Sequence, residues 1–410
     1  MSFLHHLKEV THRFERQVQF AEGYSPLYQV LFQTFANWGE AILSSPNPSL
    51  DQDLTLKWLM QTSQDRSPFE VPLLLMAGLH EIALSGETPE LSAYYPTTGG
   101  SRLAELDDPV LEKVLRQTID QNQDLLEEIL TAATVQTNET GRGLIWLLPL
   151  SFTPWTELDL VDLGASAGLN LLADYRTYLL SAKNGEIEVS LGTDRSPDFF
   201  VNIKGDQHLH ARIQAQPERI IRRRIGCDLL PFHLQTLADE MRLKSYVWGD
   251  QINRIARLES GLNALRDHRA AGGSFELMSV KLPDEVLRFL KDHCEDGTAP
   301  LLLYNTFVTQ YFRPQRTEFM ETISTWAAAQ PDGRPILWLQ WEPPFDDPEQ
   351  GGLSVGGDER EPDEYGWLEW RADLWWRGAH QVFVLGWVHP HGKEVRFLPG
   401  MGDWIKFIRE

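Results

Sequence analysis

Residues 158–172 read LDLVDLGASAGLNLL and place an acidic residue directly before a run of small residues. The apolar stretch that ends at Asp162 is typical of a buried strand, and helix-forming residues follow Gly168. A strand-to-helix turn built from small residues allows a ligand to approach the backbone closely. The pattern therefore predicts a cofactor-binding turn. Its expected residues are Asp162, Gly164, Ala165, Ser166, Gly168 and Asn170.

Two other interpretations fit the same residues. Residues 164–168 spell G-x-S-x-G, the pattern of a nucleophile elbow in which a serine stands on a strained turn. Ser166 would then need an acid and a histidine later in the chain. The candidates are Asp346, Asp363, Asp373, His380, His389 and His391. Hydrolases of that fold place several strands before the elbow, whereas the chain before residue 151 is helical in character. The turn is also compatible with tight packing alone.

An acid at the end of the following strand would hold ribose hydroxyls through charge-assisted hydrogen bonds. Asp228 ends the strand-like run RRIGCD, although such an acid usually stands about 20 residues after the glycine turn. Asp194 is nearer to that spacing but lies among turn-forming residues. We therefore prefer Asp228, which requires an insertion between the two motifs. A helix N-cap is the alternative role for this residue.

Other polar residues follow strand-like runs. Asp250 and Gln251 come after SYVW, and we expect Asp250 to contact the adenine or the substrate, or else to cap the next helix. Trp248 could stack on a base or belong to the core. Asn305 ends the apolar run PLLLYN and is a candidate catalytic residue, and Tyr311 is expected to contact the substrate.

A dense polar group stands just before the turn, at Thr137 and its neighbours. Asn138 and Arg142 are expected to bind substrate, and Glu139 is the best candidate for a general base, with a helix-ending polar turn as the alternative. His389 and His391 alternate and could form a metal pair, but no third ligand stands at a useful spacing. We therefore expect no metal site.

The elements that must position these residues change character near residue 151. The first 150 residues show helical periodicity, with Ser25 and Pro26 starting one helix and a long helix over 107–133. After residue 151, strand-like runs alternate with helical ones, which indicates a largely parallel sheet.

Three further features of this second part are expected from its sequence. A helix should cover 167–183, and a hairpin insertion should lie near 186–205. The run 342–366 is rich in Gly, Pro and acidic residues and predicts a long surface loop.

Bulk composition excludes several classes of partner. The formal net charge of −22 disfavours nucleic acid and anionic membranes, since both need a basic face. Two cysteines give no disulfide framework, and no apolar segment at the start has the form of a signal peptide. We expect a cytoplasmic protein with a small-molecule substrate, no nucleic acid and no membrane partner.

Several motifs, in order, resemble one bacterial family, the domains of unknown function number 2332. They are QTNETGR (136–142), VDLGASAGLNLLADYRTY (161–178), IGCDLLP (225–231), YVWGDQINRIARL (246–258) and HPHG (389–392). The resemblance implies a class I methyltransferase fold with a helical N-terminal extension. It brings no settled activity.

Taken together, these features predict an α/β protein with a doubly wound, mostly parallel, Rossmann-like sheet of the methyltransferase type over 151–410. A helical cap domain over 1–150 should precede it. The expected function is S-adenosylmethionine-dependent methylation of a small molecule. The alternatives are an adenosyl-binding protein without catalysis and a serine hydrolase using Ser166.

The motifs depart from class I enzymes in three places. Ser166 replaces the middle glycine of the acidic-x-Gly-x-Gly-x-Gly pattern. SVKLP (279–283) lacks the acid or amide that often meets the adenine amino group. NTFV (305–308) departs from the Asn-Pro-Pro-aromatic pattern of amine-methylating enzymes.

Overall fold

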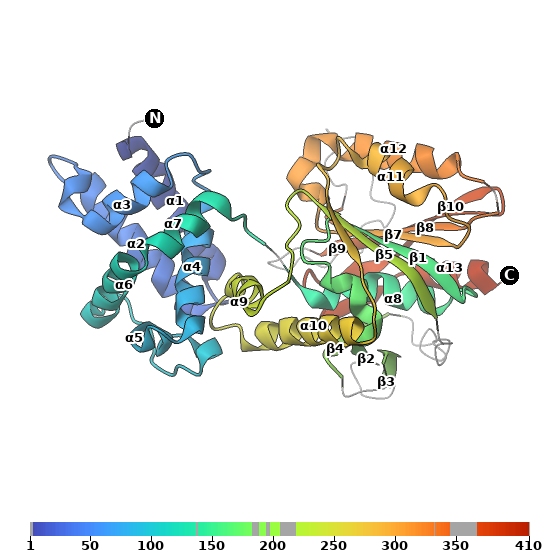
Figure 1. The fold of residues 1–410 in the computed structure, drawn as a ribbon, viewed down its shortest axis with the longest axis horizontal. Helices are drawn as coiled ribbons and strands as arrows, with labels where there is room; N and C mark the ends of the chain where they lie inside the picture. Colours follow the sequence, from blue (N-terminus) through green and yellow to red (C-terminus); the bar gives the residue numbers. More distant parts are fainter. Residues whose placement is uncertain are drawn as a thin grey trace. The chain divides into compact units, whose positions relative to one another are not determined.

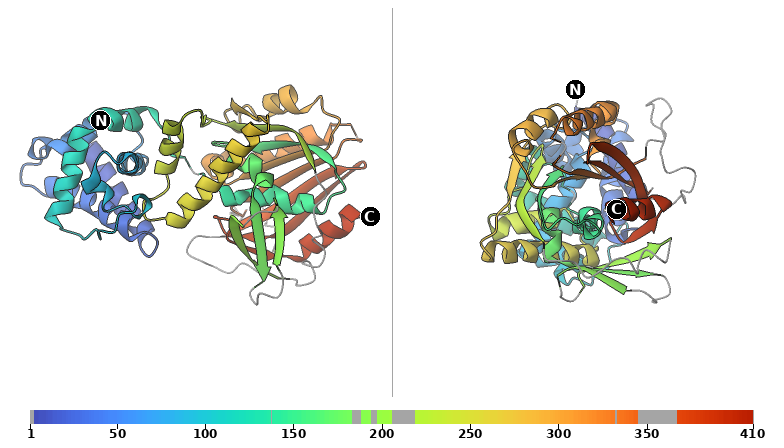
Figure 2. Two further views of the ribbon diagram at one scale, coloured as in Figure 1. Left: turned by 60° about the horizontal axis from the view of Figure 1, so that its bottom comes forward. Right: turned by 90° about the vertical axis from the view of Figure 1, so that its right-hand side faces the viewer.

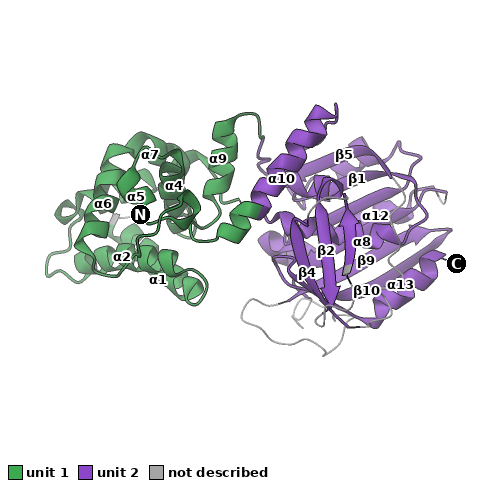
Figure 3. Cartoon of the chain, turned by 90° about the horizontal axis from the view of Figure 1, so that it is seen from below, with its two compact units in different colours: residues 1–137, 234–256 green, residues 138–233, 257–410 purple. Residues whose placement is uncertain are grey.

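The chain forms two compact units. The computed structural model describes residues 3–136, 138–182, 188–193, 197–205, 219–331, 333–344 and 367–409. Unit 1 comprises residues 1–137 and 234–256, and unit 2 comprises residues 138–233 and 257–410 (Figure 3). Residues 138–150, which were expected in the helical domain, belong to unit 2.

Unit 1 is helical. Its helices are α1 (Phe3–Ala21), α2 (Pro26–Leu43), α3 (Leu54–Thr62), α4 (Val71–Ser85), α5 (Pro89–Ser92), α6 (Pro109–Gln121), α7 (Gln123–Ala132) and α9 (Leu237–Ser245), with 3-10 turns η1 (Leu50–Gln52) and η2 (Pro96–Thr98). Ser25 caps α2 through its hydroxyl, as its sequence predicts. The single helix expected over 107–133 is divided into α6 and α7 at Asn122. Helix α10 (Ile252–Ala270) begins in unit 1 and continues into unit 2.

Unit 2 is an α/β unit around one mixed, mostly parallel sheet. The strands are β1 (Glu157–Leu163), β2 (Thr177–Ala182), β3 (Glu188–Gly192), β4 (Phe199–Lys204), β5 (Ile220–Asp228), β6 (Glu276–Ser279), β7 (Leu301–Thr306), β8 (Ile336–Glu342), β9 (Leu368–Trp376), β10 (Ala379–Val388) and β11 (Glu394–Phe397). Their spatial order is β3-β2-β4-β11-β10-β9-β8-β7-β1-β5-β6. Strands β6, β5, β1, β7 and β8 are mutually parallel neighbours.

Helices cover both faces of this parallel region (Figure 1). They are η3 (Thr140–Gly143), α8 (Leu144–Ser151), η4 (Leu169–Tyr175), α11 (Val286–Cys294), η6 (Thr309–Gln315) and α12 (Arg316–Ala328). Helix α13 (Pro399–Arg409) packs against β10 instead. Alternate residues of β1 point to opposite faces: Leu160 packs in the cluster around α8, and Val161 packs in the cluster of α11 and α12. Every residue of β1 from Leu158 to Leu163 is buried, including two aspartates, because both faces of the strand are covered.

Helix α8 is buried on every side. All residues from Leu144 to Leu150 are buried, and they pack in one cluster with residues of β1, β7, β8, β9 and β10. The right-hand view of Figure 2 shows this helix end-on within the curve of the sheet. A helix that is apolar all round needs such an enclosed position. Within the described part of the chain, no helix combines the length and the apolar character that a membrane crossing requires.

Two expectations about the segment after the turn are wrong. The helix expected over 167–183 is a 3-10 helix, η4, followed by strand β2, in which Tyr178 and Leu180 are buried at alternate positions. The expected hairpin of β3 and β4 does not form, because β2 lies between them and pairs with both. Strand propensity at Thr177 and Tyr178 outweighs the helical spacing. The expected surface loop lies outside the described residues from residue 345 onward.

Candidate functional site

The predicted turn lies at the carboxyl end of β1, beside the end of β5. The amide groups of Gly164 and Ala165 both donate to the carbonyl oxygen of Cys227, at 2.8 and 2.9 Å. Three residues have positive φ: Gly164 (102°), Ser166 (50°) and Gly168 (72°). Gly164 and Ser166 are partly exposed. The backbone is therefore sharply turned, and two of its residues face solvent.

Packing alone accounts for some of the small residues. A Cβ on Gly164 would lie 2.8 Å from Val308 Cγ2, and one on Gly168 would lie 2.6 Å from Phe275 Cε2. These distances are shorter than side chains tolerate, so both glycines are required even without a ligand. Tight packing therefore explains Gly164 and Gly168. It does not explain Ser166, which is partly exposed.

Asp228, the residue expected to hold a ribose, forms a hydrogen bond to the turn. Its Oδ2 accepts from the amide of Ser166 at 2.9 Å, and its Oδ1 accepts from the amide of Leu230 at 3.1 Å. The amide of Phe232 donates to the carbonyl of Ser166 at 3.1 Å. A carboxylate has about four acceptor positions, so Asp228 retains capacity for further donors. The competing candidate, Asp194, lies outside the described residues.

Asp162 has a strongly perturbed carboxyl group. It is 3% exposed, and burial is the main cause that raises its pKa to about 7. The negative charge of Asp228 raises the pKa further, while the Tyr304 hydroxyl and the Arg142 charge oppose the shift. The group is therefore partly protonated at neutral pH, and a nearby cation would favour its ionised form.

Two asparagines beside the turn each have one satisfied and one unsatisfied amide atom. Asn138 Oδ1 accepts from the amide of Ala167 at 3.4 Å, and Asn170 Nδ2 donates to the carbonyl of Glu139 at 3.3 Å. These bonds fix which amide atom is which. The buried Asn138 Nδ2 and Asn170 Oδ1 have no hydrogen-bond partner among the described residues. Buried polar atoms of this kind call for a water, an ion or a ligand.

Arg142 and Tyr311 lie near the same turn. Arg142 donates through Nε to the carbonyl of Pro390 at 3.0 Å, and its guanidinium lies 5.2 Å from the ring centre of Phe307. Tyr311 is 74% exposed and lies within electrostatic range of Arg142 and Asp228. Both predicted substrate residues are therefore neighbours of the turn.

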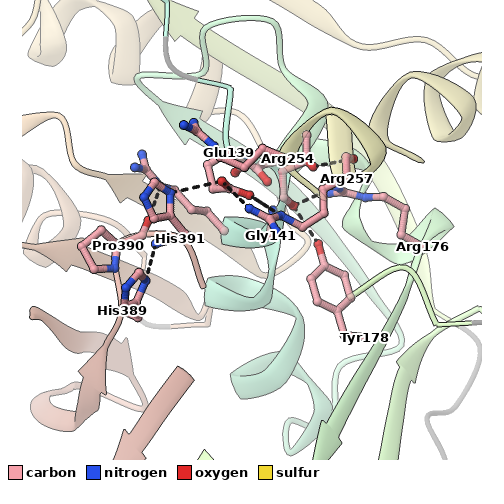
Figure 4. A network of polar contacts seen from close by, with 12 residues as sticks. Glu139, Gly141, Arg176, Tyr178, Arg254, Arg257, His389, Pro390 and His391 are labelled. Atoms are coloured by element: carbon pink, nitrogen blue, oxygen red, sulfur yellow. Dashed lines mark hydrogen bonds and ion pairs between the residues drawn. The ribbon is translucent and has the colours of Figure 1, made fainter. Parts of the chain in front are cut away.

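Glu139 is held in a buried ion-pair network (Figure 4). Its carboxylate accepts two hydrogen bonds from Arg257, at 2.9 and 3.0 Å, and Oε2 lies 3.2 Å from Nδ1 of His391. A carboxylate in a bidentate pair with arginine strongly favours its ionised form. This arrangement disfavours the expected role of Glu139 as a proton acceptor and instead makes it a support for His391. The sequence motif HPHG contained this histidine, but nothing in it indicated a partner 252 residues away.

Asn305 is buried and its amide is fully engaged. Nδ2 donates to Glu342 at 2.6 Å, and Oδ1 accepts from the Trp338 indole at 2.8 Å. The same Glu342 carboxylate accepts from the amides of Val308 and Thr309 at 2.9 and 3.1 Å. Because the side chain is 0% exposed, it is not presented to a substrate. The geometry favours a structural role in fixing the loop after β7.

Asp250, Gln251 and Trp248 make their described contacts within unit 1. Asp250 accepts from the Ser25 hydroxyl at 2.7 and 2.8 Å and thereby supports the start of α2. Gln251 donates to the carbonyl of Tyr24 at 2.9 Å. Trp248 stacks on Tyr28 with ring centres 4.8 Å apart. The described hydrogen bonds of Asp250 thus support the start of α2, whereas the expected capping was of the helix that follows Asp250.

The predicted triad partners on the outer strands do not reach Ser166. Asp373 and His380 form a pair at 3.1 Å, and His380 shares the register level of Asp159, near the amino end of β1. Strand β10 also lies four strand intervals from β1, about 19 Å at about 4.8 Å each. Asp346 and Asp363 lie outside the described residues.

The rings of His389 and His391, the other two candidate histidines, lie next to each other. The centres of His389 and His391 are 5.4 Å apart. No group of three or more potential metal-ligating side chains occurs in the described ranges. His389 Nδ1 accepts from the amide of His391 at 3.1 Å, so this ring supports the loop backbone.

Comparisons with known proteins identify a family but no activity. A family model described as "Uncharacterized protein conserved in bacteria (DUF2332)" matches residues 11–397. No curated protein matches the chain. A solved structure, of an S-adenosylmethionine-dependent methyltransferase from Clostridium acetobutylicum ATCC 824, matches at 9% identity over 71% of this chain and 87% of that chain, with a TM-score of 0.21. A match at this score carries no weight for function.

Proposed function

The chain belongs to the DUF2332 family of bacteria, whose description names no activity, and we propose from the geometry of its turn that it is an S-adenosylmethionine-dependent methyltransferase acting on a small molecule. The observation that carries the proposal lies beside a sharply turned backbone: one buried amide atom of Asn138 and one of Asn170 have no hydrogen-bond partner among the described residues. An amino-acid group with one carboxylate and one ammonium supplies the acceptor and the donor that these two atoms lack.

The position in the sheet supports the proposal. Along the chain, β1, β5 and β6 proceed in one direction across the sheet, and β7 and β8 lie on the other side of β1. A reversal of this kind would be expected of a doubly wound, Rossmann-like sheet, and it supports that assignment. Ligands of such sheets bind outside the carboxyl ends of the strands at the reversal. The turn 163–168 lies at that place.

The acidic residues fit a ligand with a ribose and a positive charge. Asp228, at the end of the neighbouring strand, would accept hydrogen bonds from the ribose hydroxyls. Asp162 would face the cationic methionine part, which would favour the ionised carboxylate despite its burial. When bound, the cofactor supplies an activated methyl group, and the protein mainly positions the acceptor.

Calorimetry with two ligands tests the proposal. S-adenosylhomocysteine carries both the ribose and the amino-acid group, whereas adenosine carries only the ribose. Asp228→Ala should weaken both ligands by about 10- to 100-fold, because one or two hydrogen bonds to a charged group are lost. Asn138→Ala should weaken S-adenosylhomocysteine but leave adenosine unchanged.

The matched control is Asp239→Asn, which alters an acidic helix cap in unit 1. It should leave both affinities unchanged. Absence of binding of S-adenosylhomocysteine to the unaltered protein would contradict the proposal.

A second candidate is an adenosyl-binding protein without catalysis. The engagement of Asn305 by Glu342 and Trp338 favours it, because the Asn305 amide at the end of β7 is not offered to an acceptor. Binding of S-adenosylhomocysteine together with no methyl transfer from S-adenosylmethionine to any metabolite of a bacterial extract would support this candidate.

A further inference from the structure

Hydrogen bonding to Glu139 determines the tautomer of the His391 ring. A carboxylate only accepts hydrogen bonds, so the contact between Glu139 Oε2 and His391 Nδ1, at 3.2 Å, places the ring hydrogen on Nδ1. The basic lone pair of the neutral ring is then on Nε2. Carboxylate–histidine pairs of this kind orient an imidazole for proton transfer.

The support behind this histidine is rigid and charged. Glu139 is 2% exposed at its side chain and accepts two hydrogen bonds from Arg257, an arrangement that favours the charged carboxylate. The resulting negative charge would stabilise His391 after it gains a proton. An imidazolium formed there has an anionic partner already in contact, so proton uptake needs little rearrangement.

The backbone of His391 is also fixed. Its amide donates to His389 Nδ1, and burial is the main cause that lowers the pKa of His389 to about 3. His389 therefore stays neutral and keeps its acceptor at ordinary pH. The amide of Gly392 donates to the carbonyl of His389 at 2.8 Å and closes the loop. The two histidines thus have different roles in one short segment.

The same network reaches the cofactor turn. Asn170 donates to the carbonyl of Glu139, and the neighbouring Asn138 accepts from Ala167. The His391 side chain is 23% exposed, so it is not sealed within the core. The Glu139–His391 pair is therefore connected to the turn region by hydrogen bonds.

Exposed apolar side chains lie next to the turn. Leu229 is 58% exposed and Leu230 is 49% exposed, immediately after Asp228. Tyr311 is 74% exposed and lies within electrostatic range of Asp228 and Arg142. An acceptor with an apolar, flat body fits these surroundings better than a sugar or a highly charged metabolite.

We infer that His391 is the general base for the methyl acceptor, with Glu139 and Arg257 as positioning residues, and that the acceptor is a small molecule with a weakly acidic hydroxyl on an apolar body, such as a phenol. This inference rests on the proposed function. In the step, a bond forms between the acceptor oxygen and the methyl carbon, and the methyl–sulfur bond breaks with its electron pair left on sulfur. The hydroxyl proton passes to Nε2 of His391 and then to water.

The orientation of the histidine can be measured without turnover. Nitrogen-15 spectra of the histidine-labelled full chain, assigned with His391→Gln, should show the Nδ1–H tautomer for His391. Glu139→Gln should shift it toward the Nε2–H tautomer, which is preferred by a free imidazole. An Nε2–H tautomer in the unaltered protein would overturn the inference, whether or not the cofactor binds.

The base function is tested with 4-nitrophenol, whose ionised form is yellow. With S-adenosylhomocysteine bound, the probe should ionise at a pH at which the free phenol is mainly neutral. His391→Gln should reduce the ionised fraction about tenfold, the effect of one pKa unit, while S-adenosylhomocysteine affinity is unchanged. His380→Gln removes another carboxylate-paired histidine and should behave as the unaltered protein does.

The two claims fail in different ways. If calorimetry detects no S-adenosylhomocysteine binding, the proposed function fails. If the ligand binds but the probe does not ionise, or ionises equally in His391→Gln, only the inference about the base and its acceptor is overturned.

Discussion

At the scale of single residues, the sequence predicts which acidic and amide side chains lie beside the turn. It does not predict the long-range contacts that hold the neighbouring side chains in place. Asp162, Asp228 and Asn138 could be found because an acid at a strand end and polar residues before a turn are local patterns. The pairing of Glu139 with His391 joins segments 252 residues apart, so no spacing indicates it. Asn305 lies near the end of its strand, where a functional polar residue is expected, yet its side chain is held by Glu342 and Trp338 from another strand.

One residue-scale prediction concerns the pKa of Asp162. An unfolded aspartate titrates near 3.8, and burial raises the folded value to about 7. The protonated group therefore favours the fold at low pH, and this contribution is lost as pH rises through about 7. Relative to Asp162→Asn, the free energy of unfolding of unit 2 should fall by on the order of 2 kcal/mol between pH 5 and pH 8. Urea unfolding of both proteins at each pH measures it, and a difference that does not depend on pH would refute it.

Among elements, caps and buried strands followed from local patterns, whereas the segment after the turn did not. The start of α2 at Ser25 and Pro26 and the strand β7 needed only nearby residues for their prediction. Strand β2 instead depends on pairing with β3 and β4, which come later in the chain. Its side chains carry both helical and alternating spacing, and the sheet decides between them.

The loop after β7 gives the prediction at this scale. Glu342 accepts from Asn305, Val308 and both the amide and hydroxyl of Thr309. Glu342→Gln removes the charge and one acceptor oxygen, so unit 2 should lose about 2–4 kcal/mol of unfolding free energy. Denaturant unfolding followed by tryptophan fluorescence measures the loss. The exposed Glu318→Gln should change stability by less than about 0.5 kcal/mol, and equal stability of both variants would contradict the assignment.

For the whole molecule, the sequence indicated a helical part followed by an α/β part, but it did not show that unit 1 is discontinuous. Residues 234–256 return to unit 1 after strand β5. Composition does not reveal this return, because α9 and the start of α10 resemble any crossover helix. Their membership of unit 1 depends on contacts such as Arg242 with Glu81 and His80 with Ser245.

This discontinuity has a testable consequence for folding. A fragment of residues 1–137 would expose His80, Glu81 and Tyr28, which residues 234–256 cover or pair. It should therefore melt without a cooperative transition in circular dichroism. A fusion of 1–137 to 234–256 through a Gly/Ser linker should melt cooperatively. Cooperative melting of the shorter fragment at the same temperature would show that the returning segment is dispensable.

The proposed function requires that an adenosyl ligand binds against the turn after β1. A crystal structure of the protein grown with S-adenosylhomocysteine tests it most directly. We expect to find the ribose hydroxyls on Asp228 and the amino-acid group within hydrogen-bond distance of Asn138 Nδ2 and Asn170 Oδ1. A ligand bound elsewhere, with both amide atoms still unsatisfied, would contradict it.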